Sequence, residues 1–426
     1  MRMRRPATLA LAVAVAFAAC TGTPSQSPTA SPSASAAPAS TPPPTATPAA
    51  TPTPAPTVTP SPEPLVIDWT RETTTGLQPT DDIEDVVASD KLLVLAAGIR
   101  SEESFRNGFW HSTDGRAWTA ASQQSDVEVV RDLAVGGPGF VAVGNAGNDV
   151  GVWLSADGDA WERVQDDSLK NGIADTLLVT DSGLIAFGSR TDDFDQRMIW
   201  TSEDGRDWLA ATNDTGRQVA EGLLTATDYD GRAIAFVQAQ ANGPITVWET
   251  TGRADWTQVG ELPDSADALV SAAAGGPRGW IAVGSANETG APAAWASEDG
   301  RTWRSVGTGP DVSWDLVADD AGFVAVGYVG SLPGETCGDQ RPFEMKTWTS
   351  VDGDAWTLQP STEDGLASVL QAVVVDRTLL GMGIDWTKGD VGSGTGEPTA
   401  WTAPLPPVAA PATTSDEPTT PHGCGP

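Results

Sequence analysis

The sequence predicts an all-β fold, a seven-bladed β-propeller of four-stranded antiparallel blades closed by its N-terminal strand. The first observation is a nine-residue phrase, Trp-x-Ser-x-Asp-Gly-x-x-Trp, that begins at Trp110, Trp153, Trp200, Trp295 and Trp348. A degenerate copy begins at Trp248, and Trp401 opens a seventh copy that is not completed. The first tryptophans lie 43 to 53 residues apart. Repeats of roughly 40 to 50 residues are typical of stacked or radial repeat folds.

The second observation is a pair of alternating apolar segments before each phrase. Residues 139–144 read Gly-Phe-Val-Ala-Val-Gly, and residues 132–135 lie upstream across a Gly-Gly-Pro turn. Period-2 apolar patterns interrupted by Gly, Pro and Asp indicate strands joined in hairpins. Each repeat is therefore expected to form four strands, A to D, with the phrase as the C–D hairpin.

The third observation concerns the two ends of the repeat region. After Trp401 the chain reads Thr-Ala-Pro-Leu-Pro-Pro, which cannot supply a seventh D-strand. Residues 67–71, Ile-Asp-Trp-Thr-Arg, are similar to the other D-strands. We therefore expect the N-terminal strand to complete the last blade and to leave no large open sheet edge. The propeller is expected over residues 65–404 as one domain, followed by a Pro-rich tail, 405–426.

The phrase also predicts the geometry of its turn. Gly115 is expected in the left-handed conformation, which only glycine adopts at little cost, at the end of a three-residue loop. Ser112 and Asp114 can accept hydrogen bonds from N–H groups of the turn. Trp110 and Trp118 each lie four residues from Asp114, so they are expected to face each other across the two strands of the C–D hairpin. A structural role is thus predicted for Ser112, Asp114, Gly115, Trp118, Ser155, Asp157, Gly158, Trp161, Ser202, Asp204, Gly205, Trp208, Ser297, Asp299, Gly300, Trp303, Ser350, Asp352, Gly353 and Trp356.

The phrase resembles the Asp-box (BNR) repeat of sialidase-like β-propellers, whose usual form is Ser-x-Asp-x-Gly-x-Thr-Trp. Here Asp and Gly are adjacent, and Thr precedes Trp only at Thr302. The resemblance implies the propeller architecture but no activity, because the repeat occurs in enzymes, receptors and assembly factors. Sialidases use a Tyr nucleophile and a Phe/Tyr-Arg-Ile-Pro signature. This chain has only Tyr229 and Tyr328 and lacks that signature, so sialidase activity is not expected.

The N-terminal residues predict export and a lipid anchor. Arg2, Arg4 and Arg5 precede an apolar run that ends at residue 19, is too short to span a membrane and is typical of a signal peptide. The sequence Phe-Ala-Ala-Cys at Cys20 resembles a bacterial lipobox, which implies removal of residues 1–19 and acylation of Cys20. The alternative is a plain secreted protein. Residues 20–64, rich in Ser, Thr, Pro and Ala, predict a disordered tether outside the bacterial cytoplasmic membrane.

The net charge and the cysteine content limit the classes of binding partner and the state of the cysteines. The formal net charge of −33 argues against nucleic acid and against membrane contact other than through the lipid anchor. If Cys20 is acylated, Cys337 and Cys424 remain as an even pair in an oxidising compartment, and we expect them to form a disulfide. No cofactor is expected, and the protein is expected to be a monomer.

Residues for catalysis are scarce. The two histidines, His111 and His422, form no zinc cluster and no Ser-His-Asp set, so no catalytic residue and no metal is predicted. Aspartates near the starts of the A-strands can either bind a cation at the centre of the ring or cap turns. These are Asp85, Asp132, Asp175, Asp267 and Asp315. A two-carboxylate glycosidase remains an alternative, because the sequence does not define carboxylate separations.

Aromatic residues outside the phrase mark a candidate binding sector. Of 17 tryptophans, only Trp280, Trp314 and Trp386 lie outside the phrase and its seam partner, and Trp280 is expected in the core. Trp314, Trp386, Tyr328 and Asp385 map to connections of blades six and seven on one face. Aromatic rings beside carboxylates suit sugar stacking or protein anchoring, and ordinary packing under long loops is the alternative.

The predicted function is a non-enzymatic binding module for a glycan or a surface protein. The alternatives are a carbohydrate-active enzyme of the glycoside hydrolase type and a scaffold that assists assembly of a membrane complex.

The lipobox predicts that Cys20→Ser moves the protein from the membrane fraction into the medium. A single acyl chain holds a protein weakly and several hold it firmly, so loss of the acylated cysteine should release it. Fractionation of cells that express either form measures this. Membrane retention of the serine variant would refute lipidation as the anchor.

Overall fold

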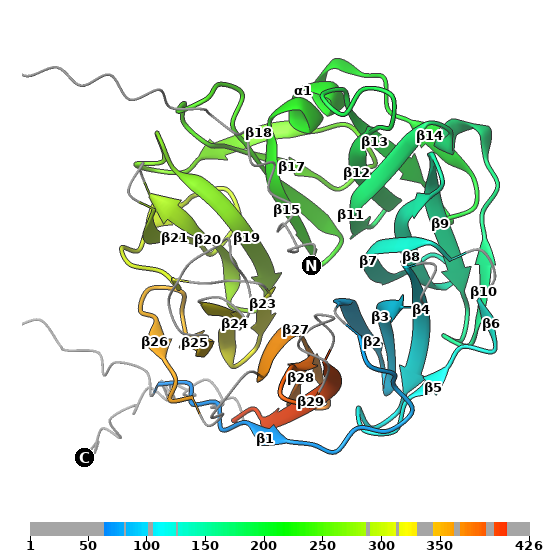
Figure 1. Cartoon of the computed structure of the whole chain (residues 1–426). Helices are drawn as coiled ribbons and strands as arrows, with labels where there is room; N and C mark the ends of the chain where they lie inside the picture. Colours follow the sequence, from blue (N-terminus) through cyan, green and yellow to red (C-terminus); the bar gives the residue numbers. More distant parts are fainter. Residues whose placement is uncertain are drawn as a thin grey trace, which may run out of the picture. The chain divides into compact units, whose positions relative to one another are not determined.

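The computed structural model describes residues 64–80, 82–100, 105–124, 127–286, 290–311, 315–329, 344–361, 367–388 and 396–406. Over this part of the chain, seven antiparallel meanders surround a common centre (Figure 1). Six sheets have four strands and one has five. The predicted seven-bladed propeller is confirmed.

Each of the first four blades runs from an innermost to an outermost strand. Blade 1 comprises β2 (Ile83–Ser89), β3 (Leu92–Arg100), β4 (Phe105–Ser112) and β5 (Thr119–Ala120). Blade 2 comprises β7 (Val129–Gly136), β8 (Gly139–Ala146), β9 (Asp149–Ser155) and β10 (Ala160–Arg163), and β6 (Gln123–Gln124) adds a fifth strand parallel to β10. Blade 3 comprises β11 (Gly172–Thr180), β12 (Gly183–Arg190), β13 (Arg197–Ser202) and β14 (Trp208–Ala210). Blade 4 comprises β15 (Leu223–Tyr229), β16 (Arg232–Val237), β17 (Thr246–Thr250) and β18 (Thr257–Glu261).

The last three blades follow the same order, except that the outermost strand of blade 7 comes from the other end of the chain. Blade 5 comprises β19 (Leu269–Gly276), β20 (Gly279–Ala286), β21 (Ala291–Ser297) and β22 (Arg304–Ser305). Blade 6 comprises β23 (Asp315–Asp319), β24 (Gly322–Val329), β25 (Glu344–Ser350) and β26 (Thr357–Leu358). Blade 7 comprises β27 (Ala367–Val375), β28 (Thr378–Asp385), β29 (Glu397–Pro404) and β1 (Thr70–Arg71).

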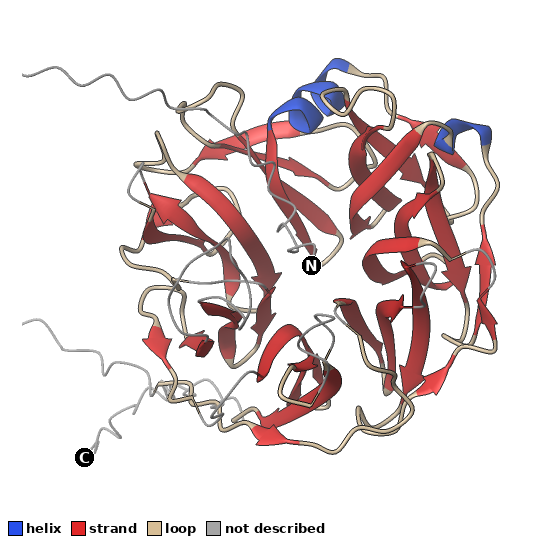
Figure 2. Cartoon of the chain, in the orientation of Figure 1, coloured by secondary structure: helices blue, strands red, loops and turns tan. Residues whose placement is uncertain are grey.

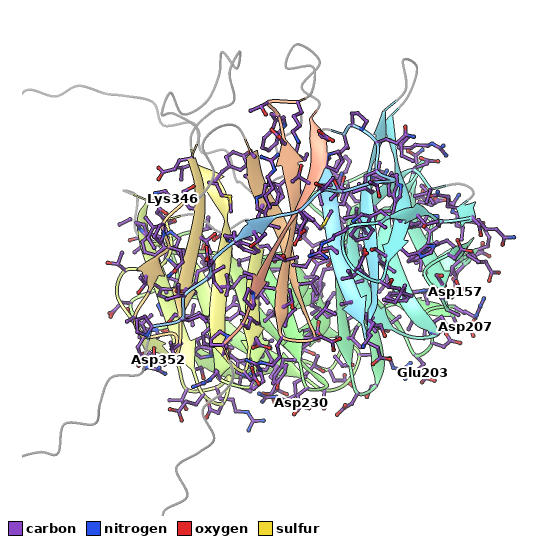
Figure 3. The ribbon with its side chains drawn as sticks, turned by 90° about the horizontal axis from the view of Figure 1, so that it is seen from below. Asp157, Glu203, Asp207, Asp230, Lys346 and Asp352 are labelled. Atoms are coloured by element: carbon purple, nitrogen blue, oxygen red, sulfur yellow. The ribbon has the colours of Figure 1, made fainter. Side chains whose placement is uncertain are left out.

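The meander gives the propeller two different faces. The A–B and C–D turns share one face, called the turn face below, and the B–C and D–A connections share the other, called the loop face. In the side view of Figure 3, Asp230 and Glu203 lie at the turn face, and Lys346 lies toward the loop face. Connections rather than strands usually carry binding residues, because loops tolerate variation on a rigid scaffold.

The hydrophobic core is divided among the contacts between blades. Seven clusters of buried residues can be traced in the described part of the chain, and each combines residues of two neighbouring blades. One cluster, for example, joins Leu95 of blade 1 to Leu380 of blade 7, and another joins Val143 of blade 2 to Leu184 of blade 3. Since a single blade has no enclosed core, burial of apolar surface depends on the complete ring.

The N-terminal segment closes the ring as predicted. In β1, Thr70 pairs with Thr402 and Arg71 with Trp401, antiparallel to β29. The preceding side chains, Leu65, Ile67 and Trp69, are buried between blades 6 and 7. Side-chain bonds add to this short ladder: the Trp69 indole donates to Thr347 Oγ1 at 2.9 Å, and Thr349 Oγ1 donates to the Leu65 carbonyl at 2.7 Å.

Contacts with the propeller core continue to Leu405. Leu405 is buried in the same cluster as Trp69. Its N–H donates to the carbonyl of Arg377 at 2.8 Å. The core contacts therefore include the first residue of the segment that was predicted to be tail.

The phrase turn has the expected hydrogen bonds but not the expected length. In blade 3, Ser202 pairs with Trp208 and Trp200 pairs with Ala210, so five residues form the loop. In blade 1, Trp110 likewise faces Ala120. The predicted three-residue loop and the cross-strand pair of Trp110 with Trp118 are therefore wrong. The aspartate side chain explains the longer loop, because it binds N–H groups that the strand ladder would otherwise need to satisfy.

Hydrogen bonds from three side chains hold this loop. Ser202 Oγ accepts from the Gly205 N–H at 2.8 Å. Asp204 Oδ1 accepts from the N–H groups of Arg206 at 2.8 Å and of Asp207 at 3.2 Å. The Trp208 indole donates to the Gly205 carbonyl at 2.7 Å. Gly205 has φ +80°, and the equivalent Gly115, Gly158, Gly300 and Gly353 have φ between +70° and +80°, as the sequence predicts.

Within the described residues, two short helices lie on connections between blades, as Figure 2 illustrates. The 3₁₀ helix η1 (Asp167–Leu169) follows β10, and α1 (Asp214–Gly222) follows β14. The side chain of Asn213 caps α1 by accepting the Gly216 N–H, and α1 buries Val219 and Ala220. The all-β prediction did not include these helices. Within the described residues, neither helix nor any other has the length and apolarity needed to cross a bilayer.

We predict that Gly205→Ala destabilises the domain by at least roughly 1 kcal/mol, because alanine is strained in the left-handed conformation. Gly252→Ala is the matched control, since this turn glycine of blade 4 has no left-handed φ and its nearest non-neighbouring atom lies 3.5 Å from an added Cβ. Denaturant unfolding of both variants measures the difference. Equal losses of stability at the two positions would contradict this account of the turn.

Candidate functional site

An open cavity toward the centre of the ring is a candidate site. It measures about 480 Å³ and lies among the innermost strands of blades 2, 3 and 4. Strands β7, β11 and β15 and the adjacent A–B turns contribute its walls, so it lies toward the turn face. Its lining includes Leu133, Val135, Leu177, Val179, Asp181 and Asp228. The lining combines apolar side chains with polar groups, its exposed surface is more polar than apolar, and the cavity is open to solvent.

Asp228 supplies one of the two carboxylates of this cavity. Burial raises the pKa of Asp228 to about 6, although a hydrogen bond from the Val179 N–H partly offsets this effect. Near that pH the carboxyl group is present in both protonation states. It can therefore either donate or accept a hydrogen bond, and it can exchange a proton with a bound group.

The turns of blades 3 and 4 bring Asp181 to the same cavity. The Asp181 N–H donates to the Gly231 carbonyl at 3.0 Å. A Cβ on Gly231 would lie 2.0 Å from Asp181 Oδ1, and Gly231 has φ +72°. Only glycine therefore allows the two turns to approach this closely. The cavity carries two carboxylates and no basic side chain among its lining residues.

Three of the five A-strand aspartates tie neighbouring blades together. Asp85 of blade 1 accepts the Leu133 N–H of blade 2 at 2.9 Å. Asp132 of blade 2 accepts the Leu177 N–H of blade 3 at 2.7 Å. Asp315 of blade 6 accepts the Ala372 N–H of blade 7 at 2.7 Å. Each also accepts the N–H of its own following residue, so these three carboxylates act as links between innermost strands.

The remaining aspartates of that group have different surroundings. Asp175 lies near Arg131 and Arg197, whose charges partly offset the raised pKa that burial gives it. Asp267 is exposed and precedes β19. Burial and the neighbouring Asp85 raise the pKa of Asp132 above its ordinary value. In the described part of the chain, no three His, Cys, Asp or Glu residues are grouped as a metal site would need.

The predicted aromatic sector on the loop face is largely buried where it is described. Trp386 is 4% exposed and lies edge-on to Tyr328, with ring centroids 6.0 Å apart. Asp385 is 1% exposed and forms an ion pair with Arg71 of the seam strand. Ligand binding by Trp386 or Asp385 would thus require exposure of buried side chains. The role proposed for these residues stays a prediction, and Trp280 is in the core as expected.

A smaller cavity of about 210 Å³ lies beside that sector, along the seam. Its lining contains the charged side chains of Arg71, Glu72, Lys388 and Glu397. Lys388 Nζ lies 3.5 Å from Glu397 Oε2, and Thr402 Oγ1 donates to Glu72 Oε1 at 2.6 Å. The charges of this cavity are thus already engaged in holding the N-terminal segment against blade 7.

Several predicted positions lie outside the described residues. They are the acylation site Cys20, the disulfide partners Cys337 and Cys424, the aromatic residue Trp314, and His422. Their predicted roles therefore remain predictions.

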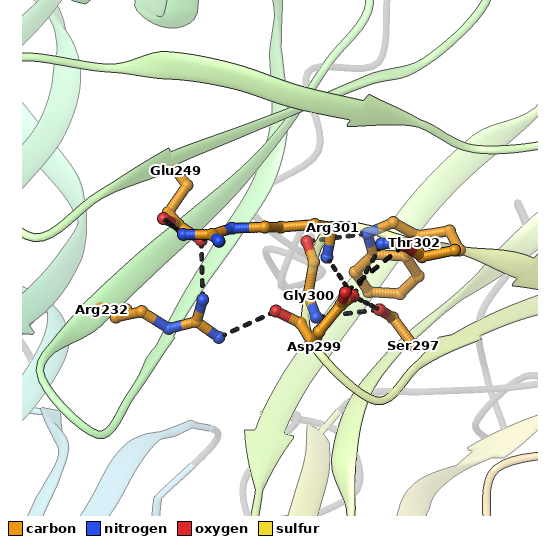
Figure 4. Close-up of polar contacts among 8 residues, drawn as sticks. Arg232, Glu249, Ser297, Asp299, Gly300, Arg301 and Thr302 are labelled. Carbon is orange, nitrogen blue, oxygen red and sulfur yellow. Dashed lines mark hydrogen bonds and ion pairs between the residues drawn. The ribbon is translucent and has the colours of Figure 1, made fainter.

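The turn face carries a set of contacts between blades that sequence reasoning missed. In blade 5, Arg301 follows the glycine of the phrase and makes a two-pronged ion pair with Glu249 of blade 4, with distances of 2.7 and 3.2 Å (Figure 4). Arg232 of blade 4 binds the same carboxylate at 2.7 Å. Glu249 therefore joins two blades through two guanidinium groups.

The same position is charged in all five complete copies of the phrase, which is a signal present in the sequence. Arg116 pairs with Glu72, and Arg206 pairs with Glu162. Where the residue is acidic, the partner changes accordingly: Asp159 accepts from Ser122, and Asp354 pairs with Arg304. Each partner lies on the preceding blade or follows its outermost strand, as Ser122 follows β5. Each exposed ion pair contributes at most about 1 kcal/mol to the free energy of unfolding. The main effect of these pairs is therefore to fix the position of each blade relative to its neighbour.

The comparisons with known proteins assign no family. No protein-family model matches the chain, and no curated protein matches it. A solved structure of the Aleuria aurantia lectin with α-methyl-L-fucoside aligns at TM-score 0.36 and 14% identity, over 70% of this chain and 94% of the lectin. Polysaccharide lyase Uly1 aligns at TM-score 0.49 and 8% identity, over 78% of this chain and 92% of the lyase. Phage phi92 endosialidase aligns at TM-score 0.43 and 10% identity, over 85% of this chain and 72% of the endosialidase. At this level, the similarity carries no argument about ligand or activity.

The raised pKa of Asp228 predicts a specific pH dependence of stability. Its ordinary value is 3.8 and its value in the fold is about 6, so between these values the unfolded chain has lost a proton that the fold retains. Stability contributed by Asp228 is therefore present below about pH 4 and is lost as pH rises to about 6. Asp228→Asn should remove this loss in thermal unfolding between pH 4 and 7.

Asp204→Asn is the matched control for that measurement. Backbone N–H groups of Arg206 and Asp207 lower the pKa of Asp204. Its contribution to stability is thus present above about pH 4 and is lost as pH falls below it. The Asp204→Asn profile should therefore run parallel to wild type, at lower stability, between about pH 4 and 7. A parallel pH profile for wild type and Asp228→Asn would contradict the prediction.

Proposed function

We propose that the protein is a non-enzymatic binding module, anchored at Cys20 outside the cytoplasmic membrane, that recognises a glycan or a surface protein. The central cavity receives a hydroxyl or ammonium group of the bound molecule. Asp181 and Asp228 accept hydrogen bonds from this group, and Val135 and Val179 contact its apolar part. The resemblance of the repeats to Asp-box propellers agrees with a binding role but does not select a ligand.

The observation that carries the proposal is the cavity itself. Its walls come from innermost strands of three adjacent blades. Asp85 links blade 1 to blade 2, Asp132 links blade 2 to blade 3, and Asp228 of blade 4 accepts the Val179 N–H of blade 3. A site on linked strands needs little ordering when a ligand binds, which favours affinity. Two carboxylates without a basic neighbour favour donors over anions.

The surrounding carboxylates favour binding over catalysis. Asp85, Asp132 and Asp315 each accept two backbone N–H groups, and these bonds hold the carboxylates in structural positions within the fold. His111 Nε2 lies 3.5 Å from Asp159 Oδ1 on the outer part of the phrase and does not line the cavity. Asp181 and Asp228 are the acidic residues that line the cavity, and Asp228 also accepts the Val179 N–H.

One observation favours a second function, glycoside hydrolysis. A glycosidase needs one protonated and one ionised carboxyl group, and a raised pKa identifies the acid. The pKa of about 6 for Asp228 suits that acid, with Asp181 as the second carboxylate. The two functions make different predictions for the bound molecule, which a binder retains and a hydrolase cleaves.

We predict that the purified propeller retains a glycan or peptide from an array and that Asp228→Asn and Asp181→Asn each weaken this binding by about tenfold or more. The reason is the loss of an acceptor in a partly buried site. Asp207→Asn, which changes an exposed carboxylate of a C–D turn, is the control and should bind like wild type. Binding is measured by calorimetry, and the recovered ligand by mass spectrometry.

The outcomes separate the two functions. Intact ligand with weaker binding by both cavity variants supports the binding module. Cleaved ligand, with turnover abolished in Asp228→Asn, supports the hydrolase. Unchanged binding in both cavity variants places the site elsewhere and overturns the assignment to this cavity.

A further inference from the structure

The B–C connection of blade 3, residues 190–196, exposes an aromatic ring on the loop face. Phe194 is 60% exposed and is the one aromatic residue among the exposed large hydrophobic side chains of the described residues. Asp192, Asp193 and Asp195 flank it, and all three are exposed. An exposed phenylalanine is unfavourable in water, and rings of this kind commonly anchor protein interfaces.

Hydrogen bonds brace the segment that carries the ring. The Arg190 guanidinium binds Asp192 in a two-pronged pair, with distances of 2.7 and 2.9 Å. The Asp195 N–H donates to Asp193 Oδ1 at 3.2 Å, and the Gln196 N–H donates to the Asp193 carbonyl at 3.0 Å. Phe194 therefore lies within a tight turn that its acidic neighbours close.

The turn is also attached to the neighbouring connections. The Thr191 N–H donates to the Asn171 carbonyl at 3.1 Å, and Thr191 Oγ1 donates to the Asn148 carbonyl at 3.0 Å. Asn148 belongs to the B–C turn of blade 2, and Asn171 follows η1. Because both supports belong to adjacent connections, Phe194 is presented by a preorganised surface, which lowers the cost of ordering on binding.

The charge around the ring is negative. Carboxylates of the turn, of the two supporting connections and of their adjoining strand end are Asp149, Asp166, Asp167, Asp192, Asp193 and Asp195. Against them stand two cations, Lys170 and Arg190, and these are paired with Asp167 and Asp192. A ring surrounded by this charge favours a partner with basic side chains.

We propose that the Phe194 turn is a docking site for a basic protein segment, in which an apolar site bordered by Lys or Arg receives the phenylalanine ring. The inference is independent of the central cavity, because it concerns the opposite face. A second copy of the chain does not fit this role, since it would bring the same acidic patch and a net charge of −33. Anionic lipid is disfavoured for the same reason.

The probe is a synthetic amphipathic helical peptide with leucines on one face and lysines at its borders. A matched peptide carries glutamate in place of lysine. We expect wild-type protein to bind the lysine peptide in calorimetry and to bind it more weakly at high salt. Phe194→Ala should weaken binding by about tenfold or more, the effect of a central aromatic anchor.

Matched variants separate anchoring from general attraction to an acidic protein. Leu209→Ala is the control, since Leu209 is 65% exposed on β14 of the same blade but lies outside the turn. It should bind like wild type. Asp195→Lys should weaken binding without loss of thermal stability and provides a second variant in case Phe194→Ala misfolds.

Three results would overturn the proposal. The first is equal binding of the lysine peptide by Phe194→Ala and Leu209→Ala. The second is equal binding of the lysine and glutamate peptides by wild type. The third is Phe194-dependent binding of wild type to phosphatidylcholine vesicles in the absence of binding to the lysine peptide. The last result would assign the ring to a lipid surface. Failure in this test leaves the cavity variants unaffected, because those variants lie on the turn face.

Discussion

Closure of the ring by the N-terminal strand is the constraint on which the rest of the structure depends. The backbone ladder of this seam is short, since only Thr70 and Arg71 pair with β29. Buried side chains carry much of the closure: Trp69 lies between blades 6 and 7, and Arg71 forms an ion pair with the buried Asp385. Because every core cluster lies between two blades, an open ring would expose the apolar surfaces at both free blades.

The links between neighbouring blades lie at two radii. At the outside, the charged residue after the glycine of each complete phrase contacts the preceding blade, as Arg301 contacts Glu249. At the centre, aspartates join innermost strands through backbone N–H groups, as Asp85 joins Leu133. The outer charged contacts and the inner aspartate bonds both restrict the angle between adjacent blades. They thereby hold the walls of the central cavity in place.

Blade 4 shows how the fold accommodates a degenerate repeat. Its phrase has Gly252 and Arg253 where other copies have Asp and Gly, so the aspartate and serine turn is missing. The connection before blade 4 compensates in part, because Asn213 donates to the Ala254 carbonyl and also caps α1. Arg253 still reaches Glu203 of blade 3. The contact between blades is thus retained although the local turn has changed.

The sequence by itself determined the repeat number, the blade order, the seam and the glycine conformation, because these follow from local patterns with a period of about 48 residues. The charged position after the glycine was also visible in the pattern, although its partner was not. Only the tertiary structure determines which carboxylates line the same cavity. Asp228 and Asp181 come from different blades, and Trp386 is buried in a cluster of residues from blades 1 and 7 against which Tyr328 of blade 6 packs. Sequence periodicity records which way a side chain faces along its own strand, whereas burial and pKa depend on neighbours that only ring closure brings together.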